Sequence, residues 1–305
     1  MSEPRILRIY LDPTMLRLAR EGGFGFVSQV TAAFESQAFR VDLVRNSFDQ
    51  RAKSGARRGY SLFLMDDPFH TKALTMRKAY YYPFWRIEAS AKRWEFAVAQ
   101  RSFASSEIDT VHAQNWLGKW RKWLFKSGPT EAHKSGVIYV ALQGKLREHR
   151  SFQSMSPMDM ISAVQDHAGA RKIVLGLHPG ETYSDDEQAL LETVSRSDPR
   201  VSVQTGRMEE ALKTCDLIVT QNSTAALSGM FFGKPSALFA LSDFHHVLPS
   251  ALDLGAHEAM TAAETIDIPF AQYLYWFVQL NSIKADDPEA QGQIIETCKG
   301  FDWQI

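Results

Sequence analysis

The sequence predicts an α/β protein with two Rossmann-type domains, each built on a parallel sheet. Short apolar or β-branched runs recur between residues 137 and 241, and segments with helical spacing separate most of them. Strands and helices that alternate in this way form right-handed crossovers and therefore a parallel sheet. A shorter series of the same kind occupies residues 6–65, and a chain of 305 residues is long enough for two domains.

The chain is expected to divide into three segments. Residues 1–130 form a first α/β domain with an aromatic-rich helical section, and residues 131–265 form a second Rossmann-like domain. The boundary falls in a polar stretch with Gly128 and Pro129, which is typical of a linker. Residues 266–305 are predicted to pack back on the first domain as helices, because the apolar run 270–280 needs a large surface to lie on.

In the first domain, strands are expected at residues 6–11, 39–44 and 60–65, and the glycine-rich residues 22–25 lead into a helix that extends to about Gln37. Residues 50–58 are basic and include Gly and Ser, which predicts an exposed loop. Residues 77–128 carry many tyrosines and tryptophans with interleaved arginines and lysines. We interpret most of these aromatic side chains as core, with the cations on a solvated face. The alternative is a groove that holds a sugar or lipid together with its phosphate.

In the second domain, strands are expected at residues 137–142, 172–177, 201–204, 217–220 and 236–241. Helices are predicted after Ser156-Pro157, after a capping box that begins at Ser184, and at residues 208–214. A last helix of the sheet begins at Ser223 or Thr224, directly after the strand 217–220, and ends before Pro235.

Composition excludes several classes of protein. A formal net charge of −1 is unlike the basic surplus of a general nucleic-acid binder, so no nucleic-acid partner is expected. The two cysteines provide neither a disulfide framework nor a metal cluster. With no signal peptide and no run of about 20 apolar residues, we expect a cytoplasmic protein. Peripheral association with the inner face of the cytoplasmic membrane is compatible with this composition.

The strongest functional signal is the turn at residues 221–224. A buried strand ends there and a helix begins, so unpaired backbone N–H groups and the positive end of a helix dipole lie beside the hydroxyls of Ser223 and Thr224. Such a place binds an anion, most often phosphate. Ser223 taken alone is better explained as an ordinary N-cap. His178-Pro179 also follows a predicted strand, however, and the carboxyl ends of parallel strands meet at one edge.

These motifs together resemble a known family. Gln143 after a strand, His178-Pro179, residues 216–224 and Gly233-Lys234-Pro235 occur in the order seen in bacterial capsular polysaccharide biosynthesis proteins. In particular they are similar to Kdo transferases that use CMP-Kdo, which are GT-B glycosyltransferases with two Rossmann-type domains facing a cleft. The resemblance covers about residues 137–246. The family usually has a lysine shortly before the His-Pro pair, where this chain has Leu175-Gly176-Leu177.

The resemblance implies a metal-independent glycosyltransferase that needs no cofactor and takes a nucleotide sugar as its substrate, with CMP-Kdo as the leading donor. It implies that His178, Ser223 and Thr224 contact the donor phosphate and that Gln143 lies near the nucleotide. The first domain would hold a saccharide or lipid-linked glycan acceptor. Pro179, Asn222, His245 and His246 complete the expected substrate-binding set, the two histidines because they follow the last strand at the ligand edge.

Glycosyl transfer also requires a base that deprotonates the acceptor hydroxyl. Asp66, Asp67 and Glu88 in the first domain are the candidates, with His70 nearby in sequence. A plain turn is the alternative explanation of Asp66-Asp67-Pro68, since Asp and Pro favour turns. His178 is expected to assist catalysis by stabilising the leaving phosphate. No metal site is expected, because no element carries ligands at metal-binding spacing.

Two alternatives remain open at the level of sequence. One is a UDP-sugar transferase or epimerase on the same fold. The other is a non-catalytic GT-B-like protein that binds a glycan or assists a partner enzyme, and the absent lysine favours it.

Overall fold

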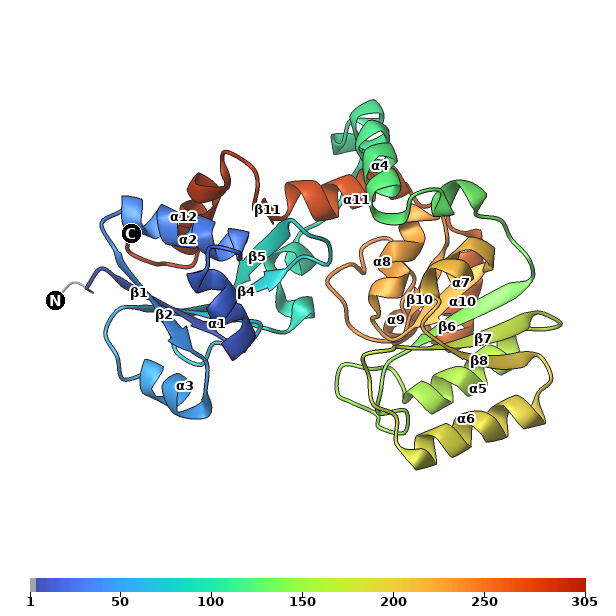
Figure 1. The fold of residues 1–305 in the computed structure, drawn as a ribbon. Coiled ribbons are helices and arrows are strands. Elements are labelled where there is room, and N and C mark those ends of the chain that lie inside the picture. Colours follow the sequence, from blue (N-terminus) through green and yellow to red (C-terminus); the bar gives the residue numbers. More distant parts are fainter. Residues whose placement is uncertain (1–3) are drawn as a thin grey trace. The chain divides into compact units, whose positions relative to one another are not determined.

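A computed structural model describes residues 4–305, and the chain forms two compact units (Figure 1). Unit 1 consists of the residues up to Arg101 together with Phe277–Ile305, and unit 2 is Ser102–Trp276. The chain therefore leaves unit 1, builds unit 2 and returns to unit 1 at its end. Each unit is an α/β structure around its own sheet.

The sheet of unit 1 has the order β11-β5-β4-β3-β1-β2. Its strands are β1 (Ile6–Leu11), β2 (Arg40–Arg45), β3 (Tyr60–Leu64), β4 (Ala73–Lys78), β5 (Phe84–Glu88) and β11 (Ile283–Lys284). The four strands from β4 to β2 are parallel, whereas β5 and β11 are antiparallel to their neighbours. The helices of this unit are α1 (Pro13–Arg20), α2 (Gly25–Ser36), α3 (Phe48–Ser54) and α12 (Ala290–Gly300).

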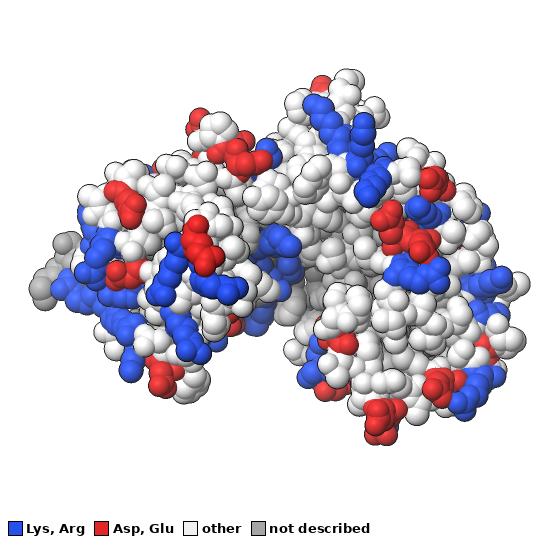
Figure 2. All heavy atoms as spheres, viewed as in Figure 1, with Lys and Arg blue, Asp and Glu red and all other residues white. Residues whose placement is uncertain are grey.

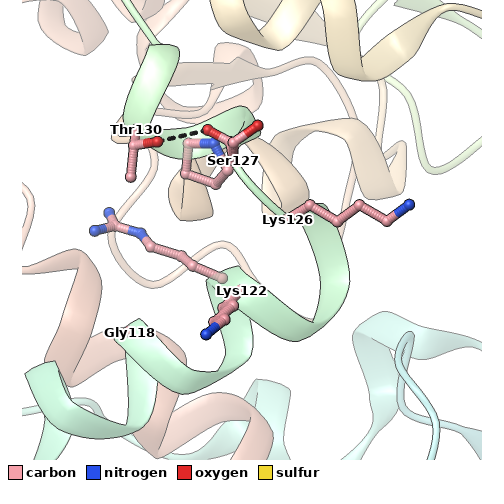
Figure 3. Close-up of a pocket in the computed structure, with 7 residues that line it drawn as sticks. Gly118, Lys122, Lys126, Ser127 and Thr130 are labelled. Carbon is pink, nitrogen blue, oxygen red and sulfur yellow. Dashed lines mark hydrogen bonds between the residues drawn. The ribbon is translucent and has the colours of Figure 1, made fainter.

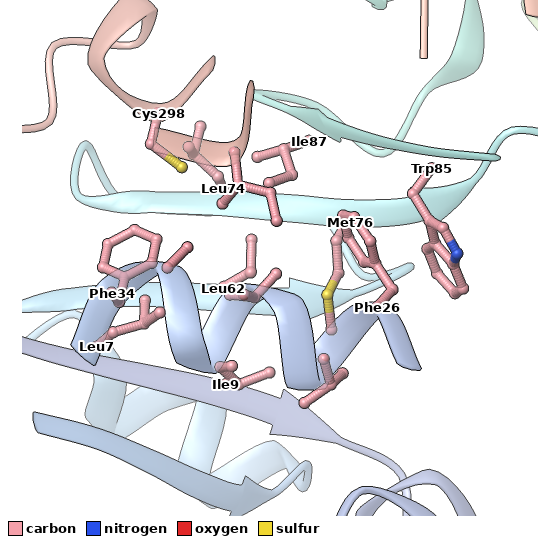
Figure 4. Close-up of a cluster of buried hydrophobic side chains, with 14 of the residues drawn as sticks. Leu7, Ile9, Phe26, Phe34, Leu62, Leu74, Met76, Trp85, Ile87 and Cys298 are labelled. Carbon is pink, nitrogen blue, oxygen red and sulfur yellow. The ribbon is translucent and has the colours of Figure 1, made fainter. Parts of the chain in front are cut away.

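The core of unit 1 lies between the sheet and helices α2 and α12. Figure 4 shows Phe26 and Phe34 of α2 and Cys298 of α12 among the apolar side chains of the strands. Phe26 stacks on Trp85 of β5 with ring centroids 4.8 Å apart. Helix α12 packs on α2, so the end of the chain from Phe277 onward belongs to unit 1.

The sequence did not predict α1, β4 or β11, and two further elements of unit 1 differ from what was predicted at their positions. Strand β5 was expected within a helical section, but it is a buried strand in which the charged Arg86 is only 4% exposed. The Arg86 guanidinium donates to the carbonyls of Phe277 at 2.7 Å and Asn281 at 2.9 Å, so it ties β5 to the returning chain. Helix α3 replaces the loop predicted at residues 50–58, and Ser47 caps it by accepting from the N–H of Gln50.

The sheet of unit 2 is parallel throughout, with the order β10-β9-β6-β7-β8. Its strands are β6 (Val137–Leu142), β7 (Lys172–Leu177), β8 (Val201–Thr205), β9 (Leu217–Thr220) and β10 (Ser236–Leu238). The chain runs outward from β6 to β8 and then crosses back to β9 and β10. This reversal places a topological switch point between β6 and β9.

Helices cover both faces of this sheet, with α5 and α6 on one face and α7 and α8 on the other (Figure 1). The helices of unit 2 are α4 (Thr110–Phe125), α5 (Pro157–His167), α6 (Asp185–Ser197), α7 (Met208–Thr214), α8 (Thr224–Phe231), α9 (Ala251–Leu254), α10 (Ala256–Thr265) and α11 (Phe270–Leu274). Short 3-10 turns are η1 (Arg93–Glu95), η2 (Ala97–Gln100), η3 (Ser105–Glu107) and η4 (Gly128–Glu131), and η5 (Tyr275–Leu280) is π-helical. None of the helices described between residues 4 and 305 has the length and apolarity needed to cross a bilayer.

Helix α4 belongs to unit 2, so the two units divide after Arg101 and not at the expected boundary near residue 130. The physical reason is aromatic packing. The ring centroid of Phe125 lies 5.5 Å from that of Phe231 and 5.0 Å from that of Phe232. Helix α4 also packs on α11. Helix α11 therefore also stays with unit 2, and only the chain from Phe277 onward joins unit 1.

Each unit contains one buried cysteine, which yields a first prediction. Cys215 and Cys298 are both 0% exposed, and burial raises the pKa of both thiols, that of Cys215 to about 12. Since the thiolate is the reactive species, neither residue should react with a thiol reagent in native buffer. Denaturant should expose each thiol when its own unit opens, as read by mass spectrometry of the labelled peptides. Labelling of either thiol in native buffer at the rate of a free cysteine would contradict this placement.

Candidate functional site

The parallel pairing of unit 2 brings the predicted site residues to one edge of the sheet. Ala141 pairs with Thr220, and Leu142 pairs with Leu177, so β6, β7 and β9 end at the same level. The loops that follow these strands carry the expected donor-binding side chains, namely Gln143, His178, Pro179, Asn222, Ser223 and Thr224. Open α/β sheets bind ligands at this carboxyl edge, at the switch point between β6 and β9.

Helix α8 begins at the switch point. Ser223 has extended backbone geometry (φ −67°, ψ 145°), and its hydroxyl accepts from the N–H of Ala225 at 3.2 Å. The N–H of Ser223 donates to the Thr220 hydroxyl at 3.4 Å, and that hydroxyl donates to the carbonyl of Ala141 at 2.7 Å. Within residues 4–305 the N–H of Thr224 has no hydrogen-bond acceptor. Ser223 is therefore the N-cap, and one helix N–H remains for an anion.

A glycine sets how closely α8 lies on β9. A methyl group added at Gly229 would come within 2.2 Å of the Ile218 side chain, far inside van der Waals contact. The helix is buried from Ala225 to Phe231, so its first turn has little freedom to shift. The N-terminus of α8 is thus held rigidly by the packing of its own body against the sheet.

The loop after β7 leans toward the end of β6. Tyr183 accepts from the N–H of His178 at 3.0 Å and donates its own hydroxyl to the carbonyl of Leu142 at 3.4 Å. Burial raises the pKa of Tyr183, so this hydroxyl keeps its proton. A methyl group at Gly144, in the loop after β6, would come within 3.0 Å of Glu181, in the loop after β7. These two loops therefore lie close together. Sequence reasoning missed Tyr183, which reads only as a residue before a capping box.

The His178 imidazole is exposed but is turned toward its own loop. Its Nδ1 accepts from the N–H of Gly180 at 3.0 Å, which requires a ring without a proton at Nδ1. The ring proton is therefore on Nε2, and His178 presents a neutral N–H donor to the solvent.

The two halves of the expected site lie on one edge but do not touch each other. Strands β7 and β9 are separated by β6, which corresponds to about 9.5 Å between their axes. Within residues 4–305 no hydrogen bond links His178 to residues 221–224. The Asn222 amide instead donates to the carbonyl of Leu241 at 3.0 Å, so this turn is held to the chain after β10. A ligand that reaches both loops has to span the end of β6, where the half-buried Gln143 lies.

His245 and His246 lie after β10 and are engaged with protein groups. Their rings stack 4.4 Å apart. His245 contacts the carbonyl of Ser242 through Nδ1 at 2.7 Å, and His246 contacts the Tyr273 hydroxyl at 3.0 Å. The His246 ring also packs edge-to-face with the Trp276 ring, with ring centroids 4.9 Å apart. These contacts favour a structural role in the wall of unit 2. Among residues 4–305 no group of three or more potential metal ligands comes together.

Lys234, in the Gly-Lys-Pro motif after α8, has a structural role. It is 3% exposed, and its ammonium donates to the carbonyls of Cys215 at 2.7 Å and His133 at 2.6 Å. Burial lowers its pKa. The lysine therefore joins the starts of β6 and β9, at the edge of the sheet opposite to the candidate site.

The three candidate bases of unit 1 occupy different environments. Asp66 follows β3 beside the switch point between β1 and β3, where it accepts from Asn46 and lies 3.3 Å from Arg51. Asp67 accepts from the N–H of Ala91 at 2.7 Å. Glu88 is 5% exposed and accepts from the N–H of Ala97 at 3.0 Å, so it is committed to holding a turn.

His70 and the aromatic section of unit 1 are largely structural. His70 lies 3.3 Å from the Ser54 hydroxyl, and burial followed by the charge of Lys72 lowers its pKa. Phe84, Trp85 and Phe96 are buried, which confirms that these aromatic side chains belong to the core.

Comparison with known proteins supports the fold. The chain is similar to the β-Kdo 2,7-transferase of KpsC from Thermosulfurimonas dismutans, with a TM-score of 0.52 at 12% identity over 95% of this chain and 98% of that one. The chain has a GT-B-like fold. At this identity the similarity concerns the fold alone. It agrees with the two-domain architecture predicted from the sequence motifs.

More distant similarities extend to two other structures. The KpsC β-Kdo 2,4-transferase of the same organism has a TM-score of 0.46 at 9% identity over 90% of both chains. UDP-GlcNAc 2-epimerase from Neisseria meningitidis, bound to UDP-GlcNAc, has a TM-score of 0.36 at 11% identity over 97% of this chain and 99% of that one. No family model matches the chain, and no curated protein matches it in sequence.

The close approach of α8 to β9 generates a second prediction. Gly229→Ala should destabilise unit 2 by about 1–3 kcal/mol, because the added methyl group overpacks against Ile218. Gly118→Ala in α4 is the matched control, since no atom lies within 4 Å of its added methyl group. That variant should be neutral or stabilised by up to about 1 kcal/mol. Equal stability of the two variants in urea denaturation would show that α8 is not held by this contact.

Proposed function

We propose that the protein is a metal-independent glycosyltransferase that transfers a sugar from a nucleotide donor, with CMP-Kdo as the leading donor, in the synthesis of a capsule or another surface polysaccharide. The observation that carries the proposal is the placement of the α8 N-terminus and the His178 loop at one carboxyl edge, on either side of β6. The GT-B-like fold and the motif resemblance support the same reaction class.

The chemistry of the site suits a departing phosphate. As the glycosidic bond breaks, negative charge develops on the phosphate, and preorganised donors stabilise that charge. The unpaired N–H of Thr224, the dipole of α8 and the Nε2–H of His178 supply such donors. The packing of α8 against the sheet fixes the position of its N-terminus. The hydrogen bond from the Gly180 N–H to Nδ1 orients the His178 ring. The proposal therefore relies on neutral donors in this unit.

We propose Asp66 as the base that deprotonates the acceptor hydroxyl. Among the three candidates it combines partial exposure, a position at the carboxyl end of β3, and two partners that hold its carboxylate in place. Glu88 is buried and already engaged with a backbone N–H. Asp67 is oriented by the N–H of Ala91, whereas two side chains, those of Asn46 and Arg51, orient Asp66.

One observation favours the non-catalytic alternative, in which the protein binds a nucleotide or glycan without turning it over. A side chain at Gly176 would collide with the Tyr139 ring, since an added methyl group would lie 2.4 Å from it. The resembling family has a lysine in this region, whereas Tyr139 fills the space here. The Tyr139 ring therefore occupies the space that any side chain at residue 176 would need.

Ligand binding provides a third prediction. CMP, UDP and ADP are compared by thermal shift, and the favoured nucleotide at 100 times its dissociation constant should stabilise the protein by about 2.7 kcal/mol. His178→Ala and Ser223→Ala should each weaken CMP binding by about tenfold or more, because each removes or misplaces a donor to a charged group. Ser250→Ala is the control, since Ser250 caps α9 as Ser223 caps α8. If neither site variant differs from this control, the donor site lies elsewhere.

Turnover provides a fourth prediction. Asp66→Asn should lower the rate of CMP release from CMP-Kdo, in the presence of a saccharide or lipid-linked glycan acceptor, by about 10²–10⁴-fold. CMP binding should be unchanged, because the substitution removes only the proton acceptor. Asp49→Asn, on the exposed face of α3, should leave both quantities unaltered. CMP binding without any CMP release by the wild-type protein would favour the non-catalytic alternative.

A further inference from the structure

Helix α4 carries an exposed stripe outside the donor site, in which the Trp123 ring packs edge-on against Trp120 with ring centroids 5.1 Å apart. Lys119, Lys122 and Trp123 follow one another at i, i+3 and i+4, so they share one face near the end of the helix, and Lys126 is the C-cap residue that directly follows the helix (φ 51°). All four are exposed, and Trp123 retains 60% of its accessible surface. The opposite face is buried in unit 2, and its members are Ala113, Trp116, Leu117 and Phe125.

The stripe is positively charged and has no acidic residue on its own element. From residue 110 to residue 130 the sequence contains no Asp or Glu. Of the carboxylates nearby, Glu131 pairs with Lys213 at 2.8 Å, and Glu209 lies against Gly128, which stands between two residues that line the hollow described below. Arg121 donates to the carbonyl of Phe231 at 2.7 Å and anchors the helix. Figure 2 shows the resulting cluster of Lys and Arg atoms over α4.

The cations of the stripe spread apart and do not converge. A hollow of about 600 Å³ lies beside the helix end, lined by Gly118, Arg121, Lys122, Lys126, Ser127, Pro129 and Thr130. In Figure 3 the Lys122 and Lys126 side chains run in different directions, and the Thr130 hydroxyl is taken by the carbonyl of Ser127 at 2.7 Å. A site for a single phosphate ion needs hydrogen-bond donors that converge on the ion, and these lysine side chains do not converge. Separated ammonium groups suit a surface that carries many anionic groups.

The apolar part of the surface indicates which anionic surface this is. Trp123 lies among the three lysines, and Val111 at the start of α4 is 67% exposed. Indole rings favour the boundary between lipid headgroups and acyl chains, and lysines beside them reach the phosphates. A helix with cations and Trp on its outer face is typical of elements that lie flat on an anionic bilayer.

We propose that α4 docks unit 2 on the surface of an anionic lipid bilayer, with Lys119, Lys122 and Lys126 at the headgroups and Trp123 inserted between them. The hollow beside Lys122 and Lys126 has room for one lipid headgroup. This inference does not depend on the donor site or on catalysis. It gives a physical basis for action on a lipid-linked substrate.

Vesicle flotation tests the proposal. The wild-type protein should float with phosphatidylcholine vesicles that contain phosphatidylglycerol and should stay behind with phosphatidylcholine alone. Each lysine near such a surface contributes about fivefold in affinity, so the triple variant K119Q/K122Q/K126Q should bind about 100-fold more weakly. Trp123→Ser should also weaken binding, whereas Trp123→Phe should retain most of it. Circular dichroism checks that all variants unfold at the wild-type midpoint.

A second triple variant controls for net charge. K134Q/K145Q/K172Q removes the same charge from exposed positions of unit 2 and should bind anionic vesicles as the wild type does. The proposal is overturned if the wild type ignores anionic vesicles at low salt, or if both triple variants lose binding equally. It is also overturned if Trp123→Ser binds vesicles normally, or if a single-stranded oligonucleotide binds through the same four residues while vesicles do not.

Discussion

The parallel pairing of β6 between β7 and β9 is the constraint on which the candidate site depends. Because the three strands run the same way and end at the same level, loops that are far apart in sequence open at one edge. Two close contacts maintain this arrangement. The Tyr139 ring lies directly over Gly176, joining β6 to β7, and Gly229 lets α8 rest on Ile218 of β9. A side chain larger than hydrogen at either glycine would move a loop that the site needs.

The same framework explains the electrostatic character of unit 2. At the switch point the donors are neutral: a helix N–H, hydroxyls and an imidazole whose Nδ1 is already an acceptor. Lys234, in the Gly-Lys-Pro motif after α8, is turned to backbone carbonyls at the far edge. Exposed cations without a carboxylate partner on their own element are found on α4. Unit 2 therefore has two distinct places for anions. The switch point suits a single phosphate, and the outer face of α4 suits a surface that carries many phosphate groups.

Sequence reasoning was most accurate where strands are buried on both faces. The limits of β6, β7 and β9 agree with the prediction, because a parallel strand covered on both sides reads as a continuous apolar run. Strand β5 was missed because Arg86 and Glu88 are charged yet buried, and their partners are backbone groups supplied by distant segments. The capping pattern at Ser223 was sufficient to place the start of α8.

What the sequence did not reveal is the direction of side chains. The motif His178-Pro179 indicated a loop at the ligand edge, but the imidazole direction depends on the Gly180 N–H, and the loop position depends on Tyr183.

The central claim is that the β7 and β9 loops hold one phosphate together. A crystal structure of the protein with CMP tests it most directly. The account predicts phosphate oxygens within about 3 Å of both the Thr224 N–H and His178 Nε2. A phosphate bound at another edge of the sheet, or by only one of these loops, would contradict it.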